Sequence, residues 1–159
     1  MNEIFRILEN DARTTPQQIA TMTGIPIGDV KKAIKKAEED RAIIKYKALI
    51  NWERLGVDNV CALIEVRLKP QRDVGFDSIA EHIYRFSQVQ STYLISGGYD
   101  LLVVITGTTM QEISTFISQK LAPLDGVEGT VTHFLLKRYK QDGEVMDGKD
   151  DPKRLPLTL

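Results

Sequence analysis

The order of hydrophobic periodicities after residue 60 is the feature that most constrains how this chain folds. Apolar residues alternate along the first segment, at Val60, Ala62, Ile64, Val66 and Leu68. A helical spacing follows over 76–86, then alternating segments over 89–96 and 101–106, a second helical segment from 109 and a last strand over 127–140. This order is typical of a ferredoxin-like α+β fold, in which both helices cover one face of an antiparallel sheet. The sequence therefore predicts a domain over 60–140 whose other sheet face needs a partner.

Turn and cap signals place the ends of these segments. Gly97 and Gly98 suit a tight hairpin turn between the second and third strands. Thr109 and Glu112 have the spacing of a capping box, which predicts a helix that begins at residue 110.

The first fifty residues predict three short helices. Thr15, Pro16 and Gln18 combine a hydroxyl N-cap, a proline at the first helical position and a glutamine three residues after the cap. That helix ends at Gly24, because glycine adopts the left-handed conformation that a sharp turn requires. A third helix over 27–40 has an apolar back centred on Val30. Alternation over 44–50 then predicts a short strand, so that 1–50 form a winged helix-turn-helix domain.

Two further segments lack a clear period. Residues 51–59 are expected to be a linker between the domains. Residues 141–159, rich in Asp, Gly, Lys and Pro, are expected to extend without regular structure.

Composition and motifs exclude several classes of protein. Of the 159 residues, 42% are hydrophobic and 27% are charged, which suits a packed core and excludes a disordered chain. No apolar run approaches the roughly 20 residues of a membrane span, and the first residues lack the basic start of a signal peptide. We therefore expect a soluble, cytoplasmic protein without a membrane partner. A net charge of -1 gives no global attraction to nucleic acid, so any such role depends on local charge.

Catalytic and metal-binding signals are absent from the sequence. Gly-x-Ser-x-Gly, Gly-x-Gly-x-x-Gly, the phosphate loop and His-Glu-x-x-His do not occur. A single cysteine, Cys61, excludes an intrachain disulfide, and with His82 and His133 it gives no metal-ligand spacing. We expect no enzymatic activity, no metal and no cofactor. Cys61 is interpreted as a buried small residue, His82 as a surface residue and His133 as a core or interface residue.

The third helix carries the strongest candidate for DNA binding, because four lysines fall on the side opposite its apolar back. The candidate DNA-binding residues are Gly28, Lys31, Lys32, Lys35, Lys36, Lys45 and Lys47. Ammonium groups there would neutralise phosphates and release counterions. The alternative is an ordinary solvated helix face, because Lys35 with Glu39 and Lys36 with Asp40 have the spacing of surface ion pairs.

A second polar group lies around the predicted hairpin and on the last strand. Its members are Ser96, Gly97, Gly98, Tyr99, Asp100, Thr130 and Thr132. Exposed backbone N–H groups, two hydroxyls and a carboxylate suit both charged ends of a small zwitterion. The alternative is a Gly-Gly hairpin with a surface tyrosine and two strand threonines.

Both halves, in this order and spacing, resemble the Lrp/AsnC (leucine-responsive or feast/famine) family of transcriptional regulators over residues 3–140. The N-terminal resemblance is carried by Ile7-Leu8-Glu9-Asn10-Asp11-Ala12-Arg13, Ile19-Ala20, Gly24-Ile25, Val30-Lys31-Lys32 and Glu38-Glu39-Asp40 before Ile43 and Tyr46. Beyond it, the carrying segments are Leu55-Gly56, Gly98-Tyr99-Asp100, Asp125-Gly126-Val127 and Thr130-Val131-Thr132.

The resemblance implies a winged helix-turn-helix that binds double-stranded DNA, followed by an amino-acid-sensing domain. It also implies that this second domain dimerises through its sheet and often assembles further into tetramers or octamers. In such proteins an amino-acid effector binds between dimers near the hairpin, which corresponds here to residues 97–100 with Thr130 and Thr132.

The chain departs from the family pattern in three places. Pro26 and Ile27 stand where the recognition helix often begins with Ser-Pro, and Lys32 with Ala33 replaces a pair of arginines. Because the planar guanidinium reads guanine bidentately, this replacement predicts weaker sequence discrimination. Arg41 replaces the usual glycine before the wing, which would alter the angle of the wing or add a phosphate contact.

Our leading hypothesis is a sequence-specific DNA-binding transcriptional regulator whose affinity or assembly responds to a small effector, expected to be an amino acid. The alternative is a small-molecule-sensing or architectural oligomer that binds DNA weakly and without sequence preference. A ferredoxin-like enzyme is a third hypothesis, which would require turnover that depends on Asp100, Tyr99 or His133.

Overall fold

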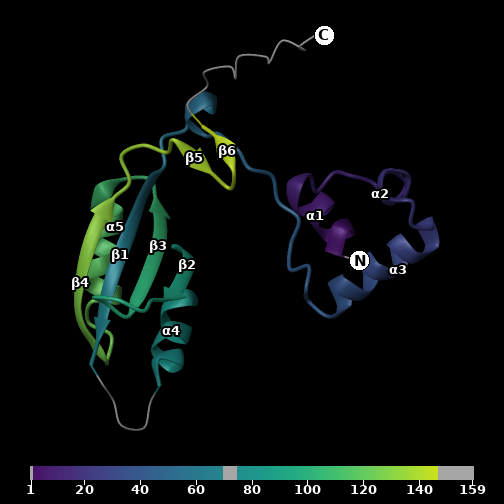
Figure 1. The fold of residues 1–159 in the computed structure, drawn as a ribbon. Coiled ribbons are helices and arrows are strands. Elements are labelled where there is room, and N and C mark those ends of the chain that lie inside the picture. Colours follow the sequence, from purple (N-terminus) through teal and green to yellow (C-terminus); the bar gives the residue numbers. More distant parts are fainter. Residues whose placement is uncertain (1, 70–74, 147–159) are drawn as a thin grey trace. The chain divides into compact units, whose positions relative to one another are not determined.

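The computed structural model describes residues 2–69 and 75–146, which form two compact units. Unit 1 ends at Ile50 and unit 2 begins at Asn51 (Figure 1).

Unit 1 contains the three predicted helices, α1 (Asn2–Asn10), α2 (Pro16–Thr23) and α3 (Ile27–Glu39). Each helix places apolar residues on one side, and these sides meet in a small core of buried Ile4, Leu8, Ile19 and Val30. The core is small because the helices are short, and half-buried Ile7, Ile25 and Ile34 extend it.

Both ends of α2 follow the local signals in the sequence. The backbone N–H of Gln18 donates to Thr15 Oγ1 at 3.3 Å, and Gln18 Oε1 accepts from the backbone N–H of Thr15 at 2.8 Å. The predicted capping box is therefore confirmed. Gly24 adopts φ 71° after α2, as expected for a glycine that ends a helix.

The prediction of a strand over 44–50 was wrong. These residues have no regular secondary structure, and every side chain from Ile44 to Ile50 is exposed. A strand forms only when a neighbouring strand satisfies its backbone groups, and the described part of unit 1 contains none. The alternation in the sequence thus marks an extended connector without strand pairing.

Unit 2 is built on a four-stranded antiparallel sheet in the order β2-β3-β1-β4. Its strands are β1 (Val60–Leu68), β2 (Val89–Leu94), β3 (Leu101–Gly107) and β4 (Val127–Phe134). Helices α4 (Phe76–Tyr84) and α5 (Met110–Phe116) lie on one face of the sheet, and α5 continues into the π-helical turn η2 (Ile117–Leu121). The predicted ferredoxin-like topology is confirmed.

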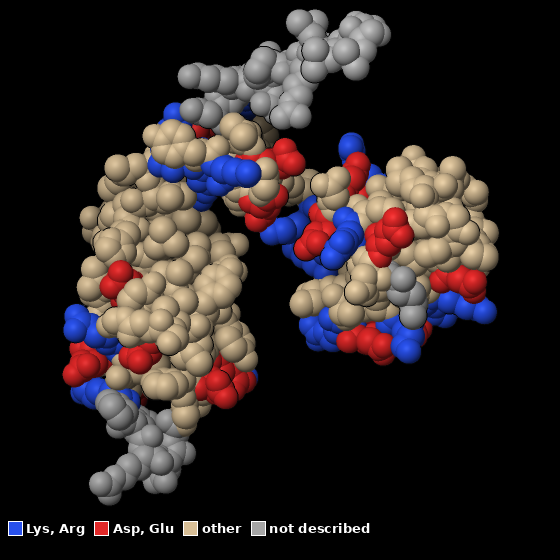
Figure 2. Space-filling model, in the orientation of Figure 1, with Lys and Arg blue, Asp and Glu red and all other residues tan. Residues whose placement is uncertain are grey.

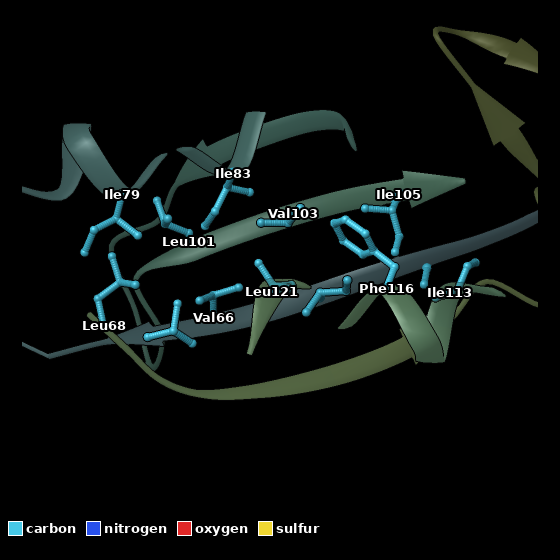
Figure 3. Close-up of a cluster of buried hydrophobic side chains, with 13 residues drawn as sticks. Val66, Leu68, Ile79, Ile83, Leu101, Val103, Ile105, Ile113, Phe116 and Leu121 are labelled. Carbon is cyan, nitrogen blue, oxygen red and sulfur yellow. The ribbon is translucent and has the colours of Figure 1, made fainter. Parts of the chain in front are cut away.

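The core of unit 2 lies between the helices and the sheet (Figure 3). Residues of β1 and β3 that face the helices are almost fully buried, for example Ile64 opposite Val103. Phe86 and Phe116 meet edge to face with ring centroids 5.2 Å apart. Burial of this apolar surface is the main source of stability for the domain.

None of the described helices covers the other face of the sheet, as predicted. Apolar residues predominate on it, including Leu63, Leu102, Val104 and Val131. A single polar pair crosses from β1 to β4, where His133 Nε2 lies 3.1 Å from Glu65 Oε1. The sheet therefore presents a half-buried apolar surface to solvent.

Several predicted boundaries were wrong. The last strand ends at Phe134 rather than 140, and the expected linker over 51–59 contains a 3₁₀ turn, η1 (Glu53–Leu55), and belongs to unit 2. Residues 141–146 were expected to lack regular structure, but β5 (Lys140–Gln141) and β6 (Glu144–Val145) form a hairpin. Its turn residues Asp142 and Gly143 both have positive φ, and an Asp-Gly pair favours this turn. Residues 147–159 lie outside the described residues.

Candidate nucleic-acid interface and effector site

Helix α3 has one face fixed by the core and the opposite face free. Val30 is fully buried and Ala37 almost so, which sets the rotation of the helix within unit 1. Ala33 packs half-buried against the same core, so it does not belong to the exposed face. The structure places Gly28, Lys31, Lys32, Lys35 and Lys36 together on the exposed side. A helix held in this way on two others can enter a DNA groove with its side chains extended.

The lysines of this face differ in their partners. Lys35 Nζ lies 3.7 Å from Glu39 Oε1, an exposed pair worth only about 0.3–0.5 kcal/mol. The other expected pair, Lys36 with Asp40, does not form at ion-pair distance. Within residues 2–69 and 75–146, Lys31, Lys32 and Lys36 have no ion-pair partner. Basic and acidic atoms intermix along α3 at the lower edge of unit 1 (Figure 2).

Lys45 and Lys47 lie on the connector over 44–50, which has no regular secondary structure. The connector is held to α3 at Tyr46, whose hydroxyl donates to Glu38 Oε1 at 2.9 Å. Partial burial of the phenol and this hydrogen bond to a carboxylate raise the pKa of Tyr46 above its usual value. This contact holds the segment that carries Lys45 and Lys47 to the last turns of α3. Sequence reasoning missed it, because no short-range signal links residues 38 and 46.

Arg41 stands in an unusual backbone conformation after α3. Its φ is 56°, in the left-handed region that favours glycine. The backbone N–H of Arg41 donates to Glu38 O at 3.1 Å, and that of Ile43 donates to Ala37 O at 2.9 Å. These bonds close the end of the helix, and Ile43 packs against the core of unit 1. The turn therefore keeps a glycine-like backbone although the residue is arginine.

The candidate effector residues gather at one end of the sheet. The segment 95–100 joins β2 to β3, next to the end of β1 and the start of β4. Ser96, Gly97 and Gly98 are exposed, whereas Tyr99 and Asp100 are half-buried. The segment is a six-residue loop and neither glycine has positive φ, so the predicted tight turn was wrong. A Cβ atom at either glycine would meet no atom closer than 3.7 Å, which leaves the loop surface open.

Asp100 ties this loop to the sheet. Its Oδ2 accepts from the backbone N–H of Leu68 at 2.8 Å, and its own N–H donates to Val66 O at 3.1 Å. The carboxylate thus accepts the hydrogen bond of a backbone N–H of β1. This N–H lies where the register between β1 and β4 shifts, between Arg67 and Leu68. One of the two carboxylate oxygens is thus used within the chain.

Thr130 and Thr132 lie on β4, on the helix-covered side of the sheet. Thr130 is opposite Val66 and Thr132 is opposite Ile64, so both point to the same face as the core, at its edge. Both side chains are half-buried. Asp100 and Thr130 therefore flank the end of β1 from its two neighbouring strands, which brings the two predicted parts of the site to one end of the sheet.

The remaining candidates have structural positions. Cys61 is buried, as predicted, and His82 is exposed on α4. His133 lies on the uncovered face of the sheet beside Glu65, a pairing visible only once the register of β1 and β4 is known. Among the residues that the structure describes, no three His, Cys, Asp or Glu side chains form a metal-binding group. None of the helices in the described ranges is long and apolar enough to cross a membrane.

Comparison with known proteins matches both units. Residues 2–44 match a winged helix-turn-helix DNA-binding family, and residues 61–145 match the Lrp/AsnC ligand binding domain. An uncharacterised HTH-type transcriptional regulator of Bacillus subtilis, YugG, is 49% identical over 157 residues, which is 98% of this chain and 95% of that protein. The regulator FL11 of Pyrococcus furiosus is 28% identical over 143 residues, 90% of this chain and 91% of its own.

Solved structures share the fold. A transcriptional regulator of Neisseria meningitidis in complex with L-methionine is 22% identical and has a TM-score of 0.71, with 87% of this chain and 89% of that chain covered. A feast or famine regulatory protein of Mycobacterium tuberculosis, also with L-methionine, is 19% identical with a TM-score of 0.73, covering 91% and 95%. With both domains matched in order along the chain, this protein belongs to the Lrp/AsnC family of helix-turn-helix transcriptional regulators.

Proposed function

We propose that this protein is a homodimeric regulator that reads DNA with α3 and responds to an amino acid bound at the loop over 95–100 of unit 2. The observation that carries the proposal is the exposed lysine face of α3, which the buried Val30 holds outward. In this function the protein acts in the cytoplasm without catalysis or a cofactor. The relatives that support it are regulators.

Dimerisation is assigned to the uncovered face of the sheet. Exposed or half-buried apolar residues predominate there, and Figure 2 shows a broad area of unit 2 with few charges. Removal of such a surface from water favours association with a second copy. Val131 is exposed on this face, so Val131→Asp should leave the fold intact but give a monomer in sedimentation velocity. Tyr84→Asp, at an exposed position of α4, is the matched control and should stay dimeric. A Val131→Asp variant that stays dimeric would contradict the assignment.

DNA binding follows from the dimer. Two recognition helices related by a two-fold axis meet successive major grooves about 34 Å apart, so the site should be approximately palindromic. Phosphate contacts by Lys31 and Lys36 should make affinity fall steeply with salt.

The test is fluorescence anisotropy with DNA from upstream of the protein's own gene and with scrambled DNA, over a salt series. The wild type should prefer the upstream DNA, and Lys32→Ala/Lys35→Ala should weaken binding to both. Lys120→Ala, an exposed lysine of unit 2, is the control for loss of charge. Equal weak binding to both DNAs would instead favour the architectural alternative.

The effector is assigned to the amino-acid class because the loop offers groups for both of its charges. Backbone N–H groups of the exposed Gly97 and Gly98 suit a carboxylate, and the second oxygen of Asp100 suits an ammonium group. Two of the structural neighbours were solved with L-methionine, which makes it the first ligand to test.

Calorimetry should detect binding of one of the twenty amino acids, and light scattering should show whether it changes the number of dimers in a tetramer or octamer. Asp100→Asn keeps an acceptor for Leu68 and should lose effector binding while the domain stays folded. No binding by any amino acid would refute this assignment but leave DNA binding intact.

A further inference from the structure

We propose that Asp29, in the first turn of α3, determines DNA sequence specificity by accepting a hydrogen bond from the N4 amino group of a cytosine, while Lys32 donates to the guanine of the same or the next base pair. The inference rests on the proposed DNA-binding function of α3. It concerns two side chains whose positions the structure fixes through the buried back of the helix.

The first observation is that, of the three acidic residues within α3, Asp29 alone has no side-chain partner among the described residues. Glu38 accepts from the Tyr46 hydroxyl at 2.9 Å, and Glu39 pairs with Lys35 at 3.7 Å. Asp29 is exposed, and none of the described residues donates to its carboxylate. A carboxylate without a partner at the leading end of a recognition helix is therefore available to a ligand.

The second observation is position. Asp29, Lys32 and Lys36 recur at i, i+3 and i+7, so they lie along one side of the helix. Gly28 and Lys35 lie next to them on the same exposed face. The N-terminal residues of a recognition helix are those that contact base edges. Gly28 has no side chain, and a Cβ atom there would have open space around it, so the first turn can approach a base closely.

The chemistry selects the base. A carboxylate near the phosphate backbone is repelled, and it loses its hydration inside a groove, so it is tolerated only when a donor replaces the lost water. The donors on the floor of the major groove are cytosine N4 and adenine N6. Adenine places the N7 acceptor beside its amino group, which repels the second carboxylate oxygen, whereas cytosine presents its donor without that acceptor.

The neighbouring lysine fits the same base pair. Guanine presents only the acceptors O6 and N7 in the major groove, and an ammonium group one turn after Asp29 can donate to either of them. One acidic and one basic side chain at i and i+3 thus match the donor and acceptor of a cytosine–guanine pair.

The experiment is selection of bound duplexes from a randomised pool by the full-length protein, followed by sequencing, for the wild type and three variants. The wild type should enrich cytosine at one position of each half-site, by roughly 5- to 10-fold over the other bases. Asp29→Asn should shift the preference at that position to adenine, because an amide both donates to N7 and accepts from N6. Lys32→Ala should lose the preference for the paired or adjacent guanine and weaken binding overall.

Glu39→Gln is the matched control, since it removes the same charge from the same exposed helix. It should raise affinity for all sequences without a change in base preference. If Asp29→Asn behaves like Glu39→Gln, with the enriched sequence unchanged, Asp29 only repels phosphates and the assignment is overturned. If the wild type enriches no sequence at all, the proposed DNA-reading function fails, and the assignment fails with it.

Discussion

The left-handed backbone of Arg41 leads to a prediction about stability. Its φ of 56° is costly for a residue with a β-carbon, by about 1–2 kcal/mol, and glycine would remove that cost. Glycine also gains freedom in the unfolded chain, which costs about 0.5–1 kcal/mol. Arg41→Gly should therefore stabilise unit 1 by about 0.5–1 kcal/mol, or roughly 2–8 °C in Tm for a domain this small.

The assay is thermal unfolding followed through the amide NMR signals of α2 and α3, which report on unit 1 alone. Arg41→Ala is the matched control, because it removes the guanidinium but keeps the β-carbon. It should give no gain, and Arg41→Asn should lie between the two, since asparagine tolerates this region better. If Arg41→Ala stabilises as much as Arg41→Gly, the strain argument is refuted and the charge of the side chain is the cause.

The same variants separate the two interpretations of Arg41 in DNA binding. Loss of a phosphate contact reduces the slope of log affinity against log salt by about 0.9 for each contact, in Arg41→Gly and Arg41→Ala alike. If the backbone turn affects DNA binding instead, the affinity for DNA should change in only one of the two variants. An unchanged slope in both would show that the guanidinium does not touch the phosphates.

Further predictions concern the core, the loop and the connector. Ile64→Ala should cost unit 2 about 2–5 kcal/mol, measured by urea unfolding, since Ile64 is fully buried and the cavity cannot close. Asp100→Ala should cost about 1–2 kcal/mol through the lost bond to Leu68, and exchange of the Leu68 amide with deuterium should accelerate. The raised pKa of Tyr46 means that its contact with Glu38 stabilises unit 1 below the pKa of an unfolded tyrosine, and that this stabilisation is lost as pH rises through the folded pKa. An NMR titration that gave Tyr46 an ordinary pKa, or a Tyr46→Phe variant with the same high-pH unfolding as the wild type, would contradict this.

The N-terminal unit could be predicted in detail because its signals are local. The capping box at Thr15 and the left-handed Gly24 each depend on residues at most four positions apart, and both form as expected. The rotation of α3 also follows from its own sequence, because Val30 and the lysines separate around the helix. The strand over 44–50 failed for the complementary reason: its alternation is local, but a strand needs a neighbour that the unit does not supply.

The ferredoxin-like unit was predicted in topology but not in its site. Strand order follows from the sequence of periods, because few connections are physically allowed. The role of Asp100 depends instead on the neighbour of β3, since its carboxylate reaches Leu68, 32 positions earlier in the chain. No spacing rule relates these residues, and only the assembled sheet brings them together.

Asp100 can both anchor the loop and serve the proposed effector site, because a carboxylate has two oxygens. One oxygen fixes the loop over 95–100 to the end of β1, and this anchoring limits the freedom that the loop would lose on binding an effector. The second oxygen is then held in a defined direction at the same end of the sheet as Thr130, across β1. An effector at the proposed site would contact β3 and β4 at once, so it would favour one arrangement of the sheet edge over another. Only such differential contact would let it shift the assembly proposed for this protein.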